Sequence, residues 1–196
     1  MAFRNIVKID EEKIYQISGR RLSPELSAPK ILWFKENQPE IYENTAKFLT
    51  LKDFIIYKLT GEFGIDPAHA SYSMLYNVKK EEWDQELLRE LEIDLNKLPP
   101  VYDSFEIIGK VNKKAAEASG LQEGIPVAVG GPDGSIGAVG AGLIEPDLAI
   151  NVVGTTDVFL TCSQEPIFDP EMRIVVNSHL VPGLWSIGGP MSMTGG

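Results

Sequence analysis

The sequence predicts an α/β protein, and three observations support this prediction. Residues 1 to about 100 carry mainly helical patterns, whereas strand patterns dominate after residue 147. Between these parts, the stretch 127–142 joins a short apolar strand to a run of small residues through a glycine-rich turn. A turn between a strand end and a helix start is where α/β proteins usually bind ligands.

The first hundred residues contain several segments in which a helix start or stop signal accompanies apolar residues at helical spacing. Asp10, Asp66 and Asp84 are favoured N-caps, and prolines stand at the start of other segments. Gly19 and Gly61 are C-terminal stops. Helices are therefore expected at 10–17, 29–37, 39–46, 52–59, 66–71 and 84–91.

The second half of the chain is expected to be richer in strands. A strand at 107–111 precedes an alanine-rich helix at 112–119, which Gly120 ends. A buried strand is expected at 125–129, and the small and apolar residues of 135–143 suit a buried helix packed closely against a neighbour. The remaining expected strands are 148–153, 158–162, 173–180 and 184–187, with a hairpin-like turn at 154–157.

Asp133 is the only charged side chain between Ile125 and Ile144. A lone carboxylate in a glycine turn is a candidate general base. It is also a good helix N-cap, because aspartate is favoured there and its charge suits the helix dipole. From the turn alone, the cap is the favoured interpretation and the catalytic role stays open.

A second candidate site is Gly154-Thr155-Thr156. Glycine allows the backbone to approach a phosphate, and threonine hydroxyls can donate hydrogen bonds to its oxygens. A hairpin turn needs a glycine in any case, so the motif alone favours a structural role. The pair Gly195-Gly196 has the same two interpretations.

Composition excludes several classes of function. The formal net charge is −10, and no Lys/Arg-rich run provides a phosphate-neutralising surface, so nucleic-acid binding is not expected. The single cysteine, Cys162, permits no internal disulfide and is interpreted as a core residue. His69 and His179 have no metal-ligand spacing around them, so no metal site is predicted within the protein. No stretch has the roughly 20 apolar residues that a membrane-spanning helix needs, and no signal peptide is evident; the expected location is the cytoplasm.

The familiar nucleotide-binding and hydrolase signatures are absent from the sequence. It contains no Gly-x-x-x-x-Gly-Lys-Ser/Thr, no Gly-x-Gly-x-x-Gly and no Gly-x-Ser-x-Gly.

Five segments, taken together, resemble the FGGY carbohydrate kinases, the sugar and polyol kinases that include xylulokinase, gluconokinase and glycerol kinase. Each segment is only moderately specific, but their order and spacing are similar to the family's from Glu12 to Gly196. The segments are 27–37 with Lys30 and Trp33, 60–71, 83–100, the catalytic turn 129–134, and the phosphate hairpin 153–156. The sequence departs from the family at Glu25, where an aromatic residue, methionine, glycine or serine is usual, and at Gly134, where xylulokinases usually have Asn.

The resemblance implies part of the actin-like, ribonuclease H-like α/β fold, in which ATP and sugar meet in an interdomain cleft. Residues 1–145 would belong to the N-terminal, sugar-binding domain, and residues 146–196 would begin the C-terminal, nucleotide-binding domain. The family's N-terminal Asp-x-Gly-Thr loop has no counterpart, and the chain stops after the second phosphate hairpin. The fold is therefore expected to be incomplete at both ends, as in an internal fragment.

The resemblance also implies residue roles and reverses the preference at Asp133. This carboxylate would accept the proton of the sugar hydroxyl as that oxygen attacks the γ-phosphate of ATP, which the family uses with Mg²⁺. Gly154, Thr155 and Thr156 would bind the outer phosphates, and Gly195 would contact phosphate from the second domain.

The expected function is ATP-dependent phosphorylation of a sugar or polyol, with a xylulose-type pentulose as the first candidate. The chain alone is expected to be inactive, because half of the phosphate-binding residues are missing. The alternatives are a non-catalytic module that binds a sugar or a partner protein, and one half of a split kinase. The expected small-molecule partner is a sugar. Missing strands would leave apolar surface exposed, so further copies of the chain are expected as partners as well.

Overall fold

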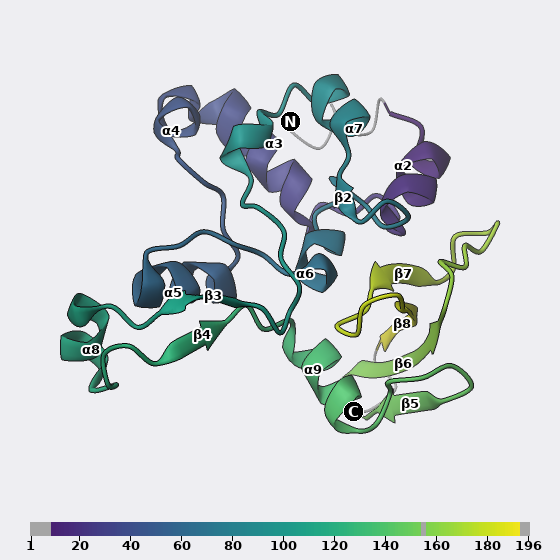
Figure 1. Cartoon of the computed structure of the whole chain (residues 1–196). Helices are drawn as coiled ribbons and strands as arrows, with labels where there is room; N and C mark the ends of the chain where they lie inside the picture. The colour runs from purple at the N-terminus through teal and green to yellow at the C-terminus, as the bar shows by residue number, and fades with distance from the viewer. Residues whose placement is uncertain (1–8, 154–155, 193–196) are drawn as a thin grey trace.

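The computed structural model describes residues 9–153 and 156–192. Helices dominate the first half, and a four-stranded sheet is formed by the chain from residue 149 onward (Figure 1). The helices are α2 (Glu11–Ser18), α3 (Ser27–Asn37), α4 (Pro39–Asn44), α5 (Leu51–Thr60), α6 (Pro67–Ser71), α7 (Gln85–Glu90), the 3₁₀ turn η1 (Leu95–Lys97), α8 (Lys113–Ser119) and α9 (Asp133–Gly140). The strands are β1 (Tyr76–Asn77), β2 (Glu82–Trp83), β3 (Ile107–Lys110), β4 (Pro126–Ala128), β5 (Ala149–Val152), β6 (Thr156–Ser163), β7 (Val175–Ser178) and β8 (Trp185–Ser192).

The helices expected in the first hundred residues are confirmed, with ends displaced by one or two residues. Asp10, Asp66 and Asp84 accept backbone N–H groups at the starts of α2, α6 and α7, as expected of N-caps. Gly19 and Gly61 take left-handed conformations after α2 and α5 and close them.

The hairpin β1–β2 and the turn η1 were not expected from the sequence. The hairpin pairs Tyr76 with Trp83, and its turn places Glu81 at φ 55°. A left-handed backbone conformation is usually signalled by glycine or asparagine in the sequence, and position 81 has neither. The two strands are also too short to show alternation.

The four strands expected after residue 147 are confirmed, and they form one antiparallel sheet in the order β5-β6-β8-β7. Val152 of β5 pairs with Val158 of β6, so these two strands pair as expected. Thr156 and Asp157 belong to β6 rather than to the expected turn at 154–157, and Gly154 and Thr155 lie outside the described residues. β8 extends beyond the expected end at Ile187. Gly188 makes this possible, since a Cβ there would lie 2.0 Å from the Phe159 carbonyl oxygen.

Three apolar clusters form the core. The largest joins α2, α3, α4 and α7, and the second joins α6 and β1 to β7. The third lies between α9 and the sheet and contains Ala138, Leu143, Cys162 and Leu184. Burial raises the pKa of the Cys162 thiol, which donates to the Glu145 carbonyl at 3.0 Å. The interpretation of Cys162 as a core residue is confirmed.

The expectation of a buried helix at 135–143, packed closely against a neighbour, is wrong. In α9 only Ala138 is buried, and Ile136 is 49% exposed. A Cβ added at Gly134, Gly137 or Gly140 would meet no atom of the described chain within 4 Å. The apolar contacts of α9 therefore lie on one side only, toward the third cluster.

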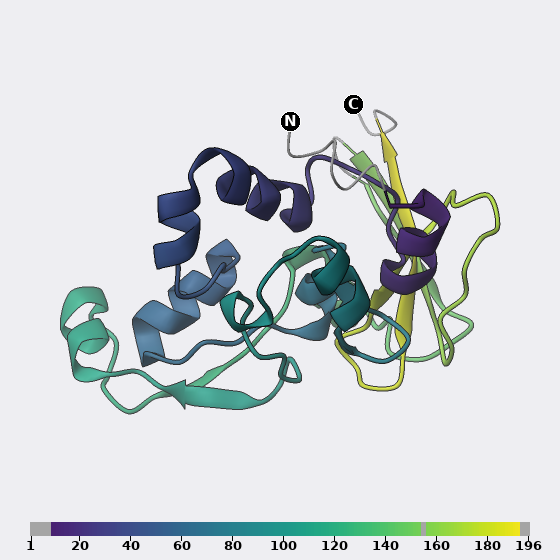
Figure 2. The same cartoon turned by 90° about the horizontal axis from the view of Figure 1, so that it is seen from above.

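Specific contacts join the helical half to the sheet, where α2 lies beside the sheet as seen from above (Figure 2). The Trp185 indole N–H donates to the Val78 carbonyl at 2.7 Å, and the Val176 amide donates to the Gly19 carbonyl at 3.1 Å. The Ser178 amide donates to the Ser71 hydroxyl at 3.1 Å. The division into domains at residue 145 stays a prediction.

Candidate active site

Asp133 is the first residue of α9, and its side chain is exposed. Its Oδ1 accepts the neighbouring Gly134 amide at 2.7 Å. The N-cap position belongs to Pro132, and no side chain caps this helix. The interpretation of Asp133 as the N-cap is therefore wrong. Its carboxylate lies at the positive end of the helix and remains open to a ligand.

The turn that leads to this carboxylate, residues 130–133, is packed and hydrogen-bonded on several sides. We call it the Asp133 turn. Gly130, at φ 67°, donates its amide to the Ser104 carbonyl at 2.7 Å. A Cβ on Gly131 would lie 2.5 Å from Leu180 Cδ2, so glycine permits close contact with the loop between β7 and β8. Pro132 is buried. An exposed carboxylate thus sits on a turn whose own backbone is fixed.

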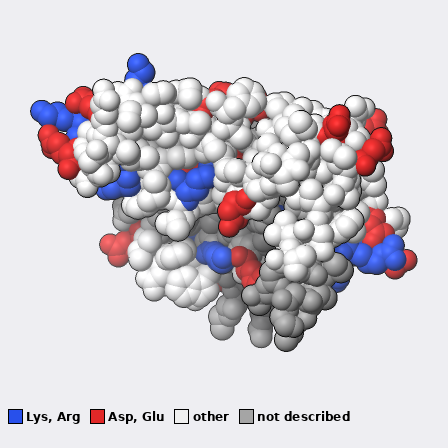
Figure 3. Space-filling view, turned by 90° about the horizontal axis from the view of Figure 1, so that it is seen from below, with Lys and Arg blue, Asp and Glu red and all other residues white. Residues whose placement is uncertain are grey.

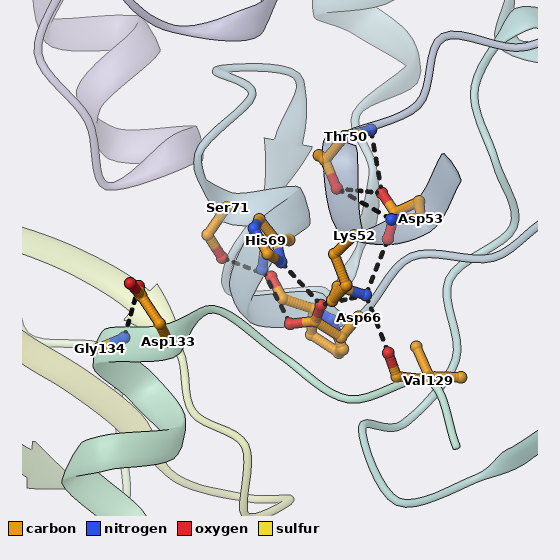
Figure 4. Close-up of polar contacts among 10 residues, drawn as sticks. Thr50, Lys52, Asp53, Asp66, His69, Ser71, Val129, Asp133 and Gly134 are labelled. Carbon is orange, nitrogen blue, oxygen red and sulfur yellow. Dashed lines mark hydrogen bonds and ion pairs between the residues drawn. The ribbon is translucent and has the colours of Figure 1, made fainter. Parts of the chain in front are cut away.

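A buried ionic cluster lies at the Val129 end of this turn (Figure 4). The Lys52 ammonium group contacts Asp53 Oδ1 at 2.7 Å and Asp66 Oδ1 at 3.1 Å. It also donates to the Val129 carbonyl at 2.9 Å. Both carboxylate side chains are fully buried, whereas the Lys52 side chain is 20% exposed. We call Thr50, Lys52, Asp53, Asp66 and His69 the Lys52 network.

Hydrogen bonds satisfy the remaining carboxylate oxygens of the network. Asp53 Oδ2 accepts the Thr50 hydroxyl at 2.7 Å and the Thr50 amide at 3.2 Å, which forms the capping box of α5. Asp66 Oδ2 accepts the His69 amide at 2.9 Å, and His69 Nδ1 lies 3.1 Å from Asp66 Oδ1. Each acid therefore takes part in capping one helix, Asp53 from the first turn of α5 and Asp66 as the N-cap of α6, while it also binds Lys52.

The pKa of the Asp66 carboxyl is lowered from its ordinary value. Burial is the largest single influence and raises the pKa, but the hydrogen bonds from His69 and the positive charge of Lys52 together outweigh it. Asp66 therefore remains ionised at neutral pH, as an ion pair with Lys52 requires.

The Lys52 network was not predicted from the sequence. Asp66 was expected to be a helix cap, which is confirmed, and Lys52 was expected at a helix start without a role. The partners of Lys52 are Asp53 in the first turn of α5, Asp66 at the N-cap of α6 and Val129 directly after β4, so no local spacing connects all three. The available signal was a Lys-Asp pair opening a helix of mainly apolar residues.

A cavity of about 330 Å³ adjoins the network. Lys30, Thr50, His69 and Trp83 are among the residues that line it. Lys30 belongs to the first segment that resembles the family, so that segment and the network face one cavity. Figure 3, which views the molecule from below, shows basic and acidic side chains at the border of a hollow on that face.

The candidate phosphate-binding residues are only partly covered by the structure. Gly154, Thr155 and Gly195 lie outside the described residues. Thr156 begins β6, where its backbone pairs with Ser192 near the end of β8. The sheet thus brings the start of β6 beside the end of β8. The assignment of these four residues to phosphate binding stays a prediction.

Within residues 9–153 and 156–192, no group of three or more His, Cys, Asp or Glu side chains could hold a metal ion. No helix in the same ranges is long and apolar enough to cross a membrane.

The model of the N-terminal domain of the FGGY family of carbohydrate kinases matches residues 2–140. The chain belongs to this family. Sugar kinases of the family act on small-molecule sugars and use ATP, generally with Mg²⁺. The resemblance drawn from the five segments is thereby confirmed.

Individual relatives agree with the family assignment. The chain is 33% identical to the autoinducer-2 kinase of Salmonella typhimurium over 175 residues, which are 89% of this chain and 33% of that protein. It is 32% identical to the xylulose kinase of Escherichia coli K12 over 171 residues, which are 87% of this chain and 35% of the relative. The chain thus spans about a third of the length of these curated relatives.

The structure is similar to the crystal structure of xylulose kinase from Rhodospirillum rubrum, with a TM-score of 0.90 and 26% identity. The match covers 99% of this FGGY-family chain and 40% of the xylulose kinase. The expected fold class is confirmed: the chain is α/β and forms part of the actin-like ATPase fold.

Proposed function

We propose that this chain supplies the catalytic base of an ATP-dependent sugar kinase and that the base is Asp133. The observation that carries the proposal is an exposed carboxylate on a fixed turn at the start of a helix. Its carboxylate is not used as the helix cap, so it is available for proton transfer.

In the proposed reaction, the Asp133 carboxylate accepts the proton of the sugar hydroxyl. The sugar oxygen forms a bond to the γ-phosphorus of ATP as the bond between that phosphorus and the bridging oxygen breaks, and ADP leaves. Most of the rate of phosphoryl transfer comes from positioning and charge stabilisation. The rigidity of the turn that holds Asp133 therefore matters as much as the basicity of the Asp133 carboxylate.

The proposed phosphoryl donor is ATP, bound together with Mg²⁺. Mg²⁺ in such sites usually takes one or two carboxylates together with phosphate oxygens and water. Asp133 is assigned as the base and not as a metal ligand, and no three-ligand cluster occurs within the described ranges. The metal would therefore be bound mainly through the nucleotide. The proposal assigns the outer phosphates to Gly154, Thr155 and Thr156 and a further phosphate contact to Gly195.

For the acceptor we propose a xylulose-type pentulose. The support is the name of one relative at 32% identity and of one solved structure at 26% identity. A second relative, 33% identical, is named autoinducer-2 kinase, so autoinducer-2 is the competing acceptor. Residues 1–145 would contribute to the sugar side of the cleft, and residues 146–196 to the nucleotide side.

The test is an assay of the full-length protein that carries this sequence, with ATP and a panel of ketoses, polyols, sugar acids and autoinducer-2. We expect phosphorylation of xylulose, and a fall in kcat of about 10³-fold or more in Asp133→Ala, which retains its fold. Residues 1–196 alone should not turn over any sugar.

Activity of Asp133→Ala within a few fold of the unsubstituted protein would refute the assigned base. Sugar binding without turnover in the full-length protein would favour the alternative, a non-catalytic binding module.

A further inference from the structure

Lys52 contacts three oxygen atoms from three separate segments. Two belong to buried carboxylates, Asp53 and Asp66, and the third is the Val129 carbonyl. The carboxylates explain why a cation is needed at this place, because a buried acid without a partner is costly. They do not explain the third contact, which lies on the strand end that leads into the Asp133 turn.

Val129 is four residues before Asp133 in the sequence. It is fully buried, and its amide donates to the Glu106 carbonyl at 3.0 Å. The stem of Lys52 lies near the first residue of the Asp133 turn, since a Cβ built on Gly130 would lie 4.0 Å from Lys52 Cδ. The direct contact of Lys52 is the hydrogen bond from its ammonium group to Val129, just before the turn.

We infer that Lys52 is a positioning residue for phosphoryl transfer: its bond to the Val129 carbonyl fixes the turn that presents Asp133. This inference rests on the proposed function for its catalytic part. Its structural part, the dependence of the Asp133 turn on Lys52, stands independently.

The same network ties the turn to the sheet. Asp66, which binds Lys52, caps α6. Ser71, the last residue of α6, accepts the Ser178 amide of β7. In the view of Figure 4, α6, with Ser71 and Asp66, stands between Asp133 and Lys52. Lys52 thus fixes Asp133 relative to the strands that the proposed function assigns to nucleotide binding.

A general stabilising role is the competing explanation, and the two differ in what they predict. If Lys52 only neutralises buried acids, its loss would weaken the whole fold and leave the folded turn unchanged. If it positions the turn, its loss would free the turn in a chain that stays folded. A displacement of about 1 Å at a reacting group can lower a rate by about 10²-fold.

The first experiment measures amide hydrogen exchange in residues 1–196 carrying Lys52→Met/Asp53→Asn/Asp66→Asn. The two asparagines keep the helix caps and remove the buried charges that Lys52→Met alone would leave unpaired. We expect exchange at 130–136 to rise at least tenfold, while exchange at 175–178 stays within about twofold. The Gly130 amide, which donates to Ser104, is the most direct reporter.

Two controls separate this effect from others. Asp53→Asn/Asp66→Asn retains Lys52 and should leave exchange at 130–136 near that of the unsubstituted chain. Lys47→Met removes a lysine that also donates to two backbone carbonyls, Asn96 at 2.6 Å and Leu98 at 2.8 Å. It should not alter exchange at 130–136 either.

The second experiment measures kinetics in the full-length protein. We expect Lys52→Met to lower kcat by about 30- to 100-fold with the KM for sugar within about threefold. Lys52→Arg, which keeps the charge and a donor, should recover part of kcat.

The outcomes are decisive. Unchanged exchange at 130–136 in the triple variant would overturn the inference, and so would unfolding of both the triple variant and Lys52→Met. If amide exchange at 130–136 rises in the triple variant but the unsubstituted full-length protein has no kinase activity, the dependence of the Asp133 turn on Lys52 is retained and the proposed function is refuted.

Discussion

Two aspartates at helix starts, Asp66 and Asp133, have similar sequence surroundings and opposite environments. Each stands next to a proline at the beginning of a short helix. Asp66 is fully buried, caps α6 and pairs with Lys52, whereas Asp133 is exposed and accepts only the amide of its own neighbour among the described contacts. The difference teaches that an acid already used by the fold stabilises it, whereas an acid left unused is available for chemistry.

The largest effect on stability is expected at Asp66. Asp66→Ala removes a helix cap and one partner of a buried ion pair, so we expect a loss of about 3 kcal/mol in the free energy of unfolding, measured by urea denaturation. The matched control is Asp94→Ala, which removes an exposed cap that accepts the Asn96 amide at 2.8 Å. It should cost about 1 kcal/mol. Equal losses in Asp66→Ala and Asp94→Ala would contradict the view that the buried ion pair gives Asp66 a larger structural role than an ordinary helix cap.

The pH dependence of stability is the next test. The folded-state pKa of Asp66 lies below its ordinary value of 3.8. A carboxyl with a depressed pKa stabilises the fold fully above its unfolded-state pKa, and this contribution is lost as the pH falls through the folded-state pKa. Urea unfolding between pH 7 and pH 2.5 should show this loss begin below about pH 4. The loss should be smaller in Asp66→Asn, and identical profiles for the two proteins would contradict the lowered pKa.

Self-association must be separated from these effects. Leu51, Phe54 and Ile55 on α5 are 80%, 46% and 50% exposed, next to the Lys52 network in the sequence. We expect residues 1–196 to self-associate in a concentration-dependent way, measured by sedimentation, and Leu51→Lys/Phe54→Lys to weaken this. Leu95→Lys, at a 42% exposed position elsewhere, is the control. A strictly monomeric chain at every concentration would contradict the expected homo-oligomer.

The smallest effect on stability is expected at Asp133. Its carboxylate makes one local hydrogen bond and is exposed, so Asp133→Ala in residues 1–196 should leave the urea midpoint unchanged. A loss of unfolding free energy comparable to that of Asp66→Ala would show that Asp133 has a structural role, and the two aspartates would then not differ as described.

The sequence could predict those features that depend on neighbouring residues. Caps such as Asp10 and Asp84, stops such as Gly19 and the four strands of the sheet all follow from local chemistry, and they are confirmed. The order of five short segments was also sufficient to indicate the family.

The remaining features depend on contacts between distant segments. Lys52 and Val129 are 77 positions apart, and neither has a local pattern that indicates the other. The one-sided packing of α9 could not be predicted, because small residues suit both a close contact and an open surface. The β1–β2 turn was missed because Glu81 takes a conformation that glycine usually signals.

The indole of Trp185 has a practical use. It donates to the Val78 carbonyl across the junction of the helical half and the sheet, and the chain has only two other tryptophans, Trp33 and Trp83. If those two are replaced by phenylalanine, the wavelength of tryptophan fluorescence reports the solvent exposure of Trp185 at that junction. Ligands or variants that part the two halves would shift this emission to the red, and no added label would be needed.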